Sequence, residues 1–145
     1  MELNAIKTPH FTLEELIKSE TATKKRIDNT PSVGVVRNLC SLIIEVLEPA
    51  RVKLGAPIIV SSGYRSVALN KAVGGVQNSQ HISGQAVDVV CTKKEDKQKL
   101  FEIFATMEFD QLLWETNSAG TQWIHISYRA DGKNRKYINR NYKAK

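Results

Sequence analysis

Apolar residues recur at helical spacing over the longest patterned stretch of the chain, residues 33–54. They lie three and four positions apart, and they are Val36, Leu39, Cys40, Ile43, Val46 and Leu47. This spacing places them on one face of a helix, which we expect to form the back of the core. Pro49 should kink or break this helix, because proline lacks an amide hydrogen and its ring crowds the preceding turn.

Two capping patterns and one short segment predict further helices. The box Thr12-Leu-Glu-Glu15 predicts a helix at about 13–19, and the box Thr92-Lys-Lys-Glu95 predicts one that ends near residue 107. Residues 66–73 predict a third short helix.

Four short segments rich in β-branched and aromatic residues predict strands. They are 57–61, 85–91, 109–115 and 122–128. A short loop separates the last two, so we expect them to pair as a hairpin. The sequence therefore predicts one α+β domain over residues 1–145, in which helices pack on a small, mainly antiparallel sheet. Its core is expected at 11–128, followed by a basic C-terminal tail at 129–145.

Composition and charge narrow the class of protein. No stretch approaches the ~18 apolar residues of a membrane span, and no signal-peptide pattern opens the chain, so we expect synthesis in the cytoplasm. Cys40 and Cys91 lie in apolar surroundings without a CxxC motif, which predicts two buried free thiols. The net charge is +6, much of it within 129–145. This charge favours an anionic partner, or else marks a solvated basic end.

Polar side chains interrupt two of the predicted strands. Asp88 lies in the strand at 85–91, and alternation puts only small or apolar residues beside it on its face. His125 interrupts the strand at 122–128 in the same way, and His81 lies in the loop seven positions before Asp88. A buried carboxylate is costly unless it pairs with a cation or accepts several hydrogen bonds.

Together these three residues have the composition of a zinc site. Two neutral imidazoles and one carboxylate leave the fourth tetrahedral position open for water, which is the layout of catalytic zinc. Taken singly, a histidine on a strand is more often a hydrogen-bonded core residue, and the spacing of His81 and Asp88 does not by itself decide between the two interpretations.

Several motifs resemble a known family over residues 11–128. They are VSSGYRS (60–66), LN followed by VGG (69–75), SQHISGQAVDV (79–89), FDQLLWE (109–115) and WIHIS (123–127). In these motifs the chain resembles the zinc D-alanyl-D-alanine carboxypeptidases, the hedgehog/DD-peptidase group, and residues 11–32 resemble its phage and prophage members. The resemblance implies the fold of that group, with His81, Asp88 and His125 as ligands of Zn²⁺.

The resemblance also assigns roles beside the metal. It implies that Glu115 is the catalytic general base and acid, Arg65 binds a substrate carboxylate, and Ser79 bonds the substrate backbone or steadies a ligand. From the residues alone, Glu115 would be an exposed strand end and Arg65 a surface residue after a turn. Two positions depart from the family: Gln122 replaces an acid found in some branches, and Trp123 replaces a histidine found in others.

The function implied is a zinc-dependent peptidase of peptidoglycan stem peptides or cross-links, acting as a D-Ala-D-Ala carboxypeptidase or an endolysin-type endopeptidase. Zinc-bound water would attack the peptide carbonyl. We expect a monomer whose partners are peptidoglycan peptides and not nucleic acid, in a phage or prophage setting that delivers it to the wall after release. Two alternatives remain open: a zinc-containing module that binds cell wall or protein without catalysis, and a nucleic-acid-binding protein that uses Tyr137 and Tyr142 in its basic end.

Overall fold

The segment predicted as the longest helix is helical throughout in the computed structural model, which describes residues 8–144. Helix α2 (Val33–Leu42) continues through a π-helical turn (Ile43–Leu47) into α3 (Glu48–Leu54). Pro49 does not break the helix. The expected disruption is the wider π-helical turn before it, which accommodates the missing amide hydrogen of proline.

Five strands form one sheet in the order β1-β2-β4-β3-β5. Their bounds are β1 (Ile59–Ser62), β2 (Ala86–Val90), β3 (Gln111–Thr116), β4 (Gln122–Ser127) and β5 (Tyr137–Lys143). The pairs β1–β2, β2–β4 and β3–β4 are antiparallel, and β3 and β4 form the predicted hairpin. The predicted α+β class with a mainly antiparallel sheet is confirmed.

The segment 129–145 contains an element that the sequence did not predict. Within its described part, β5 pairs parallel with β3 and forms an edge of the sheet. The letters YINRNYK show no apolar alternation, because the strand lies at the edge and most of its residues are exposed.

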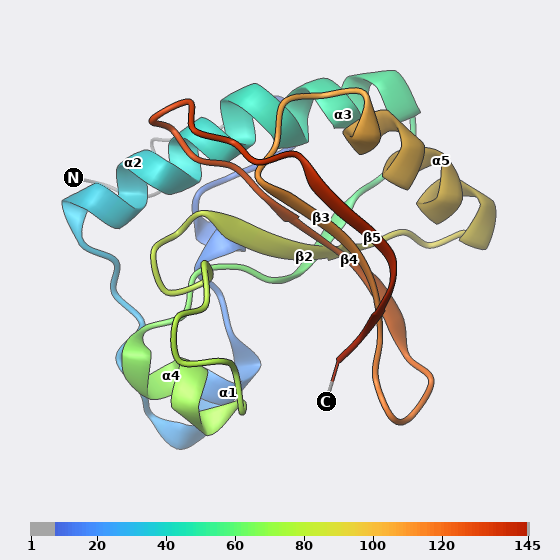
Figure 1. Cartoon of the computed structure of the whole chain (residues 1–145). Helices are drawn as coiled ribbons and strands as arrows, with labels where there is room; N and C mark the ends of the chain where they lie inside the picture. The colour runs from blue at the N-terminus through green and yellow to red at the C-terminus, as the bar shows by residue number, and fades with distance from the viewer. Residues whose placement is uncertain (1–7, 145) are drawn as a thin grey trace.

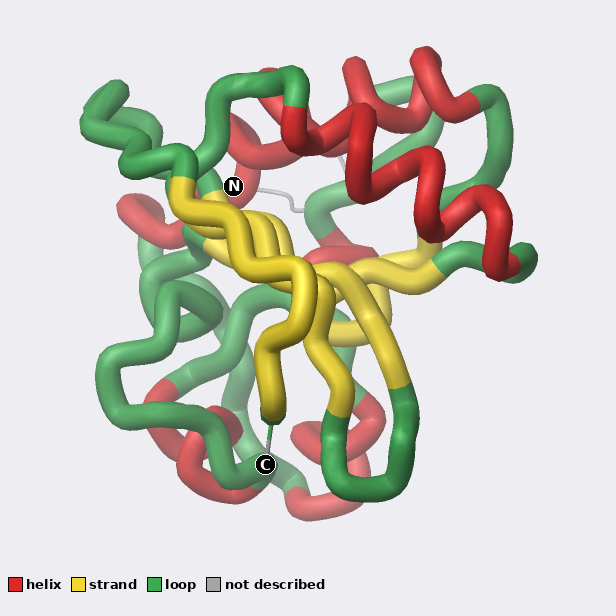
Figure 2. Tube along the Cα trace, turned by 45° about the vertical axis from the view of Figure 1, so that its right-hand side comes forward, coloured by secondary structure: helices red, strands yellow, loops and turns green. Residues whose placement is uncertain are grey.

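The sheet separates two groups of helices (Figures 1 and 2). Helices α2, α3 and α5 (Lys94–Ala105) cover one side, and the short helices α1 (Glu20–Lys25) and α4 (Val67–Ala72) lie together away from them. The strand residues that face the long helices are buried in the main core, and they are Val87, Val89, Leu112, Ile124 and Ile126, with Trp114 half-buried against it. We call this the helix face of the sheet.

The two capping boxes have different outcomes. Thr12 and Glu15 exchange backbone-to-side-chain hydrogen bonds of 3.1 and 3.2 Å, but the helix there is one 3₁₀ turn (Glu14–Leu16), and Ser19 caps α1 separately. The capping box predicted at Thr92 is wrong, because helix α5 begins at Lys94 and no side chain caps it. Ser66 caps α4 as part of the predicted short helix.

Two composition-based expectations can be compared with the described residues. Cys40 and Cys91 are free thiols, half-buried and not fully buried. Within residues 8–144, no helix combines the length and hydropathy that crossing a bilayer would require.

Candidate metal centre

Three side chains from separate segments converge on the face of the sheet opposite the helix face. Nε2 of His81 lies 3.3 Å from Oδ1 of Asp88, and Nδ1 of His125 lies 3.0 Å from the same oxygen. One donor atom from each residue lies within 4.8 Å of the other two. We call this side the metal face.

The spacing of these donor atoms fits a bound ion. Zinc ligands lie at roughly 2.0–2.1 Å in a tetrahedron, so two of them are about 3.3 Å apart. The measured separations from Asp88 are 3.0 and 3.3 Å. The set of two imidazoles and one carboxylate is also the composition of catalytic zinc sites with one open position.

Strand pairing and a tight loop bring these residues together. Asp88 and His125 are directly paired across β2 and β4. His81 comes from the loop before β2, which turns at Gly84 with φ of +74°. A side chain at Gly84 would also collide with Val35 of α2, so the loop can approach the helix only with glycine there.

The imidazole of His81 is oriented by the backbone. Its Nδ1 lies 2.8 Å from the carbonyl oxygen of Gly63. A carbonyl can only accept, so Nδ1 carries the hydrogen and Nε2 is the nitrogen left to bind a metal. This is the usual arrangement behind a metal-binding histidine. The hydroxyl of Ser79 accepts a 3.1 Å hydrogen bond from the amide of His81 and fixes the loop further.

Asp88 is held in its ionised form although it is only 8% exposed. Burial alone would raise the pKa of Asp88, but the imidazoles of His81 and His125 outweigh it and hold the pKa well below its ordinary value. The guanidinium of Arg65 lies 3.6 Å from the second carboxylate oxygen.

Arg65 is fixed in place by hydrogen bonds to two neighbours. Its Nε donates to Ser62 at 3.2 Å and its Nη1 donates to Asn70 at 3.1 Å. A Cβ at Gly75 would lie 2.1 Å from the Asn70 amide oxygen and 2.9 Å from Arg65, so this clamp requires glycine. Burial lowers the pKa of Arg65, and Asp88 and Glu115 oppose that effect, so the guanidinium stays charged.

Glu115 lies beside the cluster without belonging to it. Its Oε2 is 3.9 Å from Nδ1 of His125 and accepts a 2.7 Å hydrogen bond from the indole of Trp123, its partner on β4. Burial and the charge of Asp88 raise the pKa of Glu115, against weaker opposite effects of His125 and Trp123. A raised pKa suits a group that accepts and then returns a proton.

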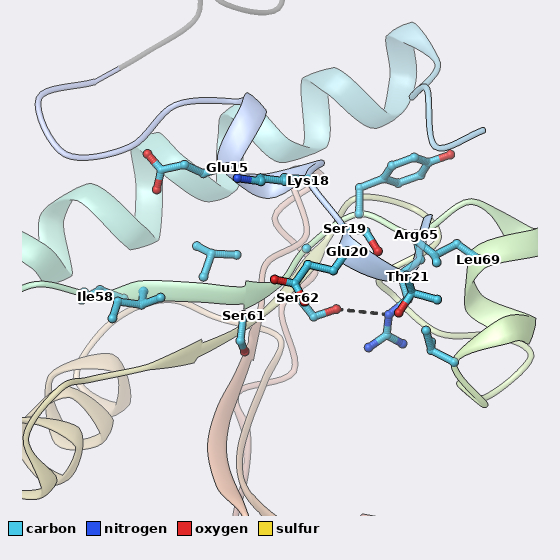
Figure 3. A pocket seen from close by; sticks show the side chains of 15 residues that line it. Glu15, Lys18, Ser19, Glu20, Thr21, Ile58, Ser61, Ser62, Arg65 and Leu69 are labelled. Atoms are coloured by element: carbon cyan, nitrogen blue, oxygen red, sulfur yellow. Dashed lines mark hydrogen bonds between the residues drawn. The ribbon is translucent and has the colours of Figure 1, made fainter. Parts of the chain in front are cut away.

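A cleft of about 720 Å³ opens next to Arg65 (Figure 3). It runs along the outer side of β1, where the sheet ends, and α1 and α4 form its other walls. The dashed bond in the figure marks Arg65 held by Ser62 at the inner end of the cleft. Of the predicted site residues, only Arg65 lines this cleft.

The structure thus brings together five of the six predicted site residues, and the sixth, Ser79, supports the histidine loop. Three further residues, which hydrogen-bond Arg65 or Glu115, were not predicted from the sequence. They are Ser62, Asn70 and Trp123. The motif VSSGYRS contained Ser62, and LN contained Asn70. Trp123 stood out as a departure from the family, although its pairing with Glu115 follows from the predicted hairpin.

Fold and site define a class: an α+β domain whose sheet can hold a metal ion beside a buried carboxylate. A family model described as peptidase M15 matches residues 9–127. The chain therefore belongs to the peptidase M15 family and is a peptidase, which confirms the resemblance of its motifs. A search of curated proteins found no match to the chain.

Proposed function

We propose that the protein is a zinc-dependent peptidase that hydrolyses peptidoglycan stem peptides or cross-links. The observation that carries this proposal is the cluster of His81, Asp88 and His125 with the carboxylate of Glu115 on the same face of one sheet. Membership of the peptidase M15 family, whose members generally depend on zinc, supports both the reaction and the metal.

The residues that would hold zinc are His81 through Nε2, His125 through Nδ1 and Asp88 through Oδ1. When bound, zinc lowers the pKa of a coordinated water from 15.7 to about 7 and polarises a carbonyl oxygen. The ionised state of Asp88 and the tautomer of His81 prepare both for this role before any metal arrives.

Glu115 supplies the proton transfers in this proposal. Its carboxylate takes a proton from the attacking water and returns it to the amine that leaves. The bond from Trp123 holds one oxygen of Glu115 in place, and the raised pKa brings its proton affinity closer to that required near neutral pH.

Arg65 binds a carboxylate of the substrate. Its guanidinium is already oriented by Ser62 and Asn70, so little conformational freedom is lost on binding. Ser79 supports His81 through the loop amide, which favours a role in steadying the ligand over contact with the substrate.

Stem peptides with D-amino acids fit the charge of the protein as well as its family. The net charge of +6 attracts the anionic cell wall. We propose further that the protein acts as a monomer on the wall after release from the cell in which it is made, as a phage or prophage product would.

The test is digestion of purified peptidoglycan by the zinc-loaded protein, with products identified by mass spectrometry. The expected result is release of D-alanine or cleavage within the stem or cross-bridge, abolished by a chelator and restored by zinc. Intact peptides across neutral pH would overturn the proposal. The masses released also decide between carboxypeptidase and endopeptidase action.

A further inference from the structure

Strand β5 lies outside the residues that the family model matches, yet it pairs directly with the strand that carries Glu115. The match ends at residue 127, and β5 covers Tyr137–Lys143. In the parallel register, Leu113 pairs with Asn139 and Glu115 pairs with Tyr142. Strand β5 therefore lies next to the candidate active site but outside the matched residues.

The register places Tyr137, Asn139 and Tyr142 of β5 on the metal face, and the last two pair with Leu113 and Glu115. Paired residues of parallel strands point to the same side of a sheet, so Asn139 lies on the face of Leu113 and Tyr142 on the face of Glu115. An irregularity between the two pairs lets β5 advance by three residues while β3 advances by two. Without that bulge, Tyr142 would point to the helix face.

The residue at the bulge points the opposite way. Arg140 donates to Glu102 of α5 at 3.1 Å, and its guanidinium lies 4.9 Å from the centre of the Phe101 ring. Arg140 thus anchors β5 on the helix face, while the side chain of Tyr142 remains 38% exposed on the other.

A second anchor holds the start of the strand. The guanidinium of Arg135 binds both oxygens of Asp110, at 3.0 and 2.7 Å, and its amide donates to the same carboxylate at 3.0 Å. Gln80, next to His81 in sequence, donates to Asp110 at 2.8 Å. The position of β5 is therefore tied to the loop that carries a candidate ligand.

We propose that Tyr142 and Asn139 form a substrate-binding rim on the metal face. This inference rests on the proposed function. Arg65 follows β1 at one edge of the sheet and β5 is the other edge. The candidate ligands Asp88 and His125 lie between them on β2 and β4. The rim contacts the part of the peptide that lies across the scissile bond from the carboxylate held by Arg65.

The distance from the metal centre to the rim determines how long a peptide must be to contact the rim. From β4 to β5 is two strand spacings, about 10 Å, which an extended peptide covers in roughly three residues. The phenol of Tyr142 offers an apolar ring and a hydroxyl, and the amide of Asn139 retains donors for a peptide carbonyl. Stem peptides that extend at least three residues beyond the scissile bond should contact the rim.

The test compares wild type with Tyr142→Ala on synthetic stem peptides of two to five residues. The ratio of KM for the longest cleaved peptide to KM for the shortest should rise about tenfold, since an aromatic contact contributes about 1 kcal/mol or slightly more. Tyr142→Phe separates the ring from the hydroxyl. Ile138→Ala is the matched control, because Ile138 pairs with Leu112 on the helix face of the same strand and is 39% exposed. This variant should leave the ratio at the wild-type value.

Two results would contradict the proposed rim: an unchanged KM ratio in Tyr142→Ala, or the same rise in Ile138→Ala. Binding of the five-residue peptide, measured by calorimetry in zinc-loaded Glu115→Ala with and without Tyr142→Ala, needs no turnover. If wild type cleaves none of the peptides, the proposed function is wrong. The calorimetric comparison still tests whether the rim binds peptide. Weaker binding without Tyr142 supports it, and equal binding contradicts it.

Discussion

Alternate residues of the same strands build two faces of different chemistry. On the helix face, Leu112, Ile124 and Ile126 are fully buried among apolar side chains. On the metal face, the residues between them include His125 and Glu115, almost equally buried but polar. The helix face gains free energy from the burial of apolar area. The metal face buries polar side chains and gains less free energy, which is the usual cost of an active site whose residues are already in position.

A similar contrast holds between the two carboxylates of the metal face. Asp88 has two imidazoles as neighbours, which keep its pKa low against the effect of burial. Burial and the negative charge of Asp88 disfavour the ionised form of Glu115, so its pKa is raised. Two acids on one face are thereby assigned to two tasks, one to hold a cation and the other to move a proton.

The largest effect should follow from Asp88→Ala. This change removes the oxygen that both imidazoles approach, so we expect loss of zinc by elemental analysis and peptidase activity no higher than that of chelator-treated protein. Asp131→Ala, which removes an exposed carboxylate far along the chain, is the control and should retain both. Full zinc content in Asp88→Ala would contradict the assignment of the site.

Glu115→Ala should separate chemistry from metal binding. Loss of a general base lowers kcat by roughly 10²–10⁴, while zinc content stays at the wild-type level because Glu115 lies outside the cluster. Both are measured on the same preparation. A variant with unchanged activity would exclude Glu115 as the base. Wild-type protein that holds zinc without any turnover would favour a non-catalytic binding module.

Ile124→Ala tests the opposite face of the same strand. Truncation of this fully buried side chain should lower the free energy of unfolding by about 2–5 kcal/mol, measured by urea denaturation, with little change in kcat at a temperature where the protein is folded. Ile44→Ala, on the exposed side of the long helix, should cost less than about 0.5 kcal/mol. Loss of kcat without loss of stability would show that the two faces are not separable.

Asp110 is a fully buried carboxylate outside the metal centre. It can therefore be compared with the two carboxylates of the metal face. Burial opposes its ionisation, but Arg135 and Gln80 outweigh this effect and lower the pKa of Asp110 to about 2. A depressed pKa contributes stability above the unfolded value near 4 and loses it as the pH falls toward 2. Wild type should therefore exceed Asp110→Asn by about 2 kcal/mol at pH 7.

This difference should shrink between pH 4 and about pH 2, as followed by urea unfolding across that range. Asp131→Asn is the matched control, since its exposed pair with Arg129 should contribute little at any pH. A difference that stays constant as the pH falls would show that the charge of Asp110 is not what stabilises the protein.

The sequence predicted those features that have a period or a motif. The helical spacing within 33–54 predicted the helix face, and the alternation around Asp88 and His125 marked two polar residues out of place in their strands. Only the resemblance to a known family assigned them, with His81, as ligands. Strand β5 was missed because an exposed edge strand has no apolar period, and the cap at Thr92 failed because a capping pattern does not fix where the backbone turns. Asp110 was missed because its partner Arg135 lies 25 positions away, and only tertiary structure brings the two together.

The position of β5 has a practical consequence for purification. The strand ends where Lys143 pairs with Thr116, one residue after the pair formed by Tyr142 and Glu115. A polyhistidine tag added after this strand would bring extra imidazoles close to the candidate ligands, where they would compete for added metal and obstruct long peptides. Preparations for metal analysis should therefore carry the tag at the other terminus or have it removed.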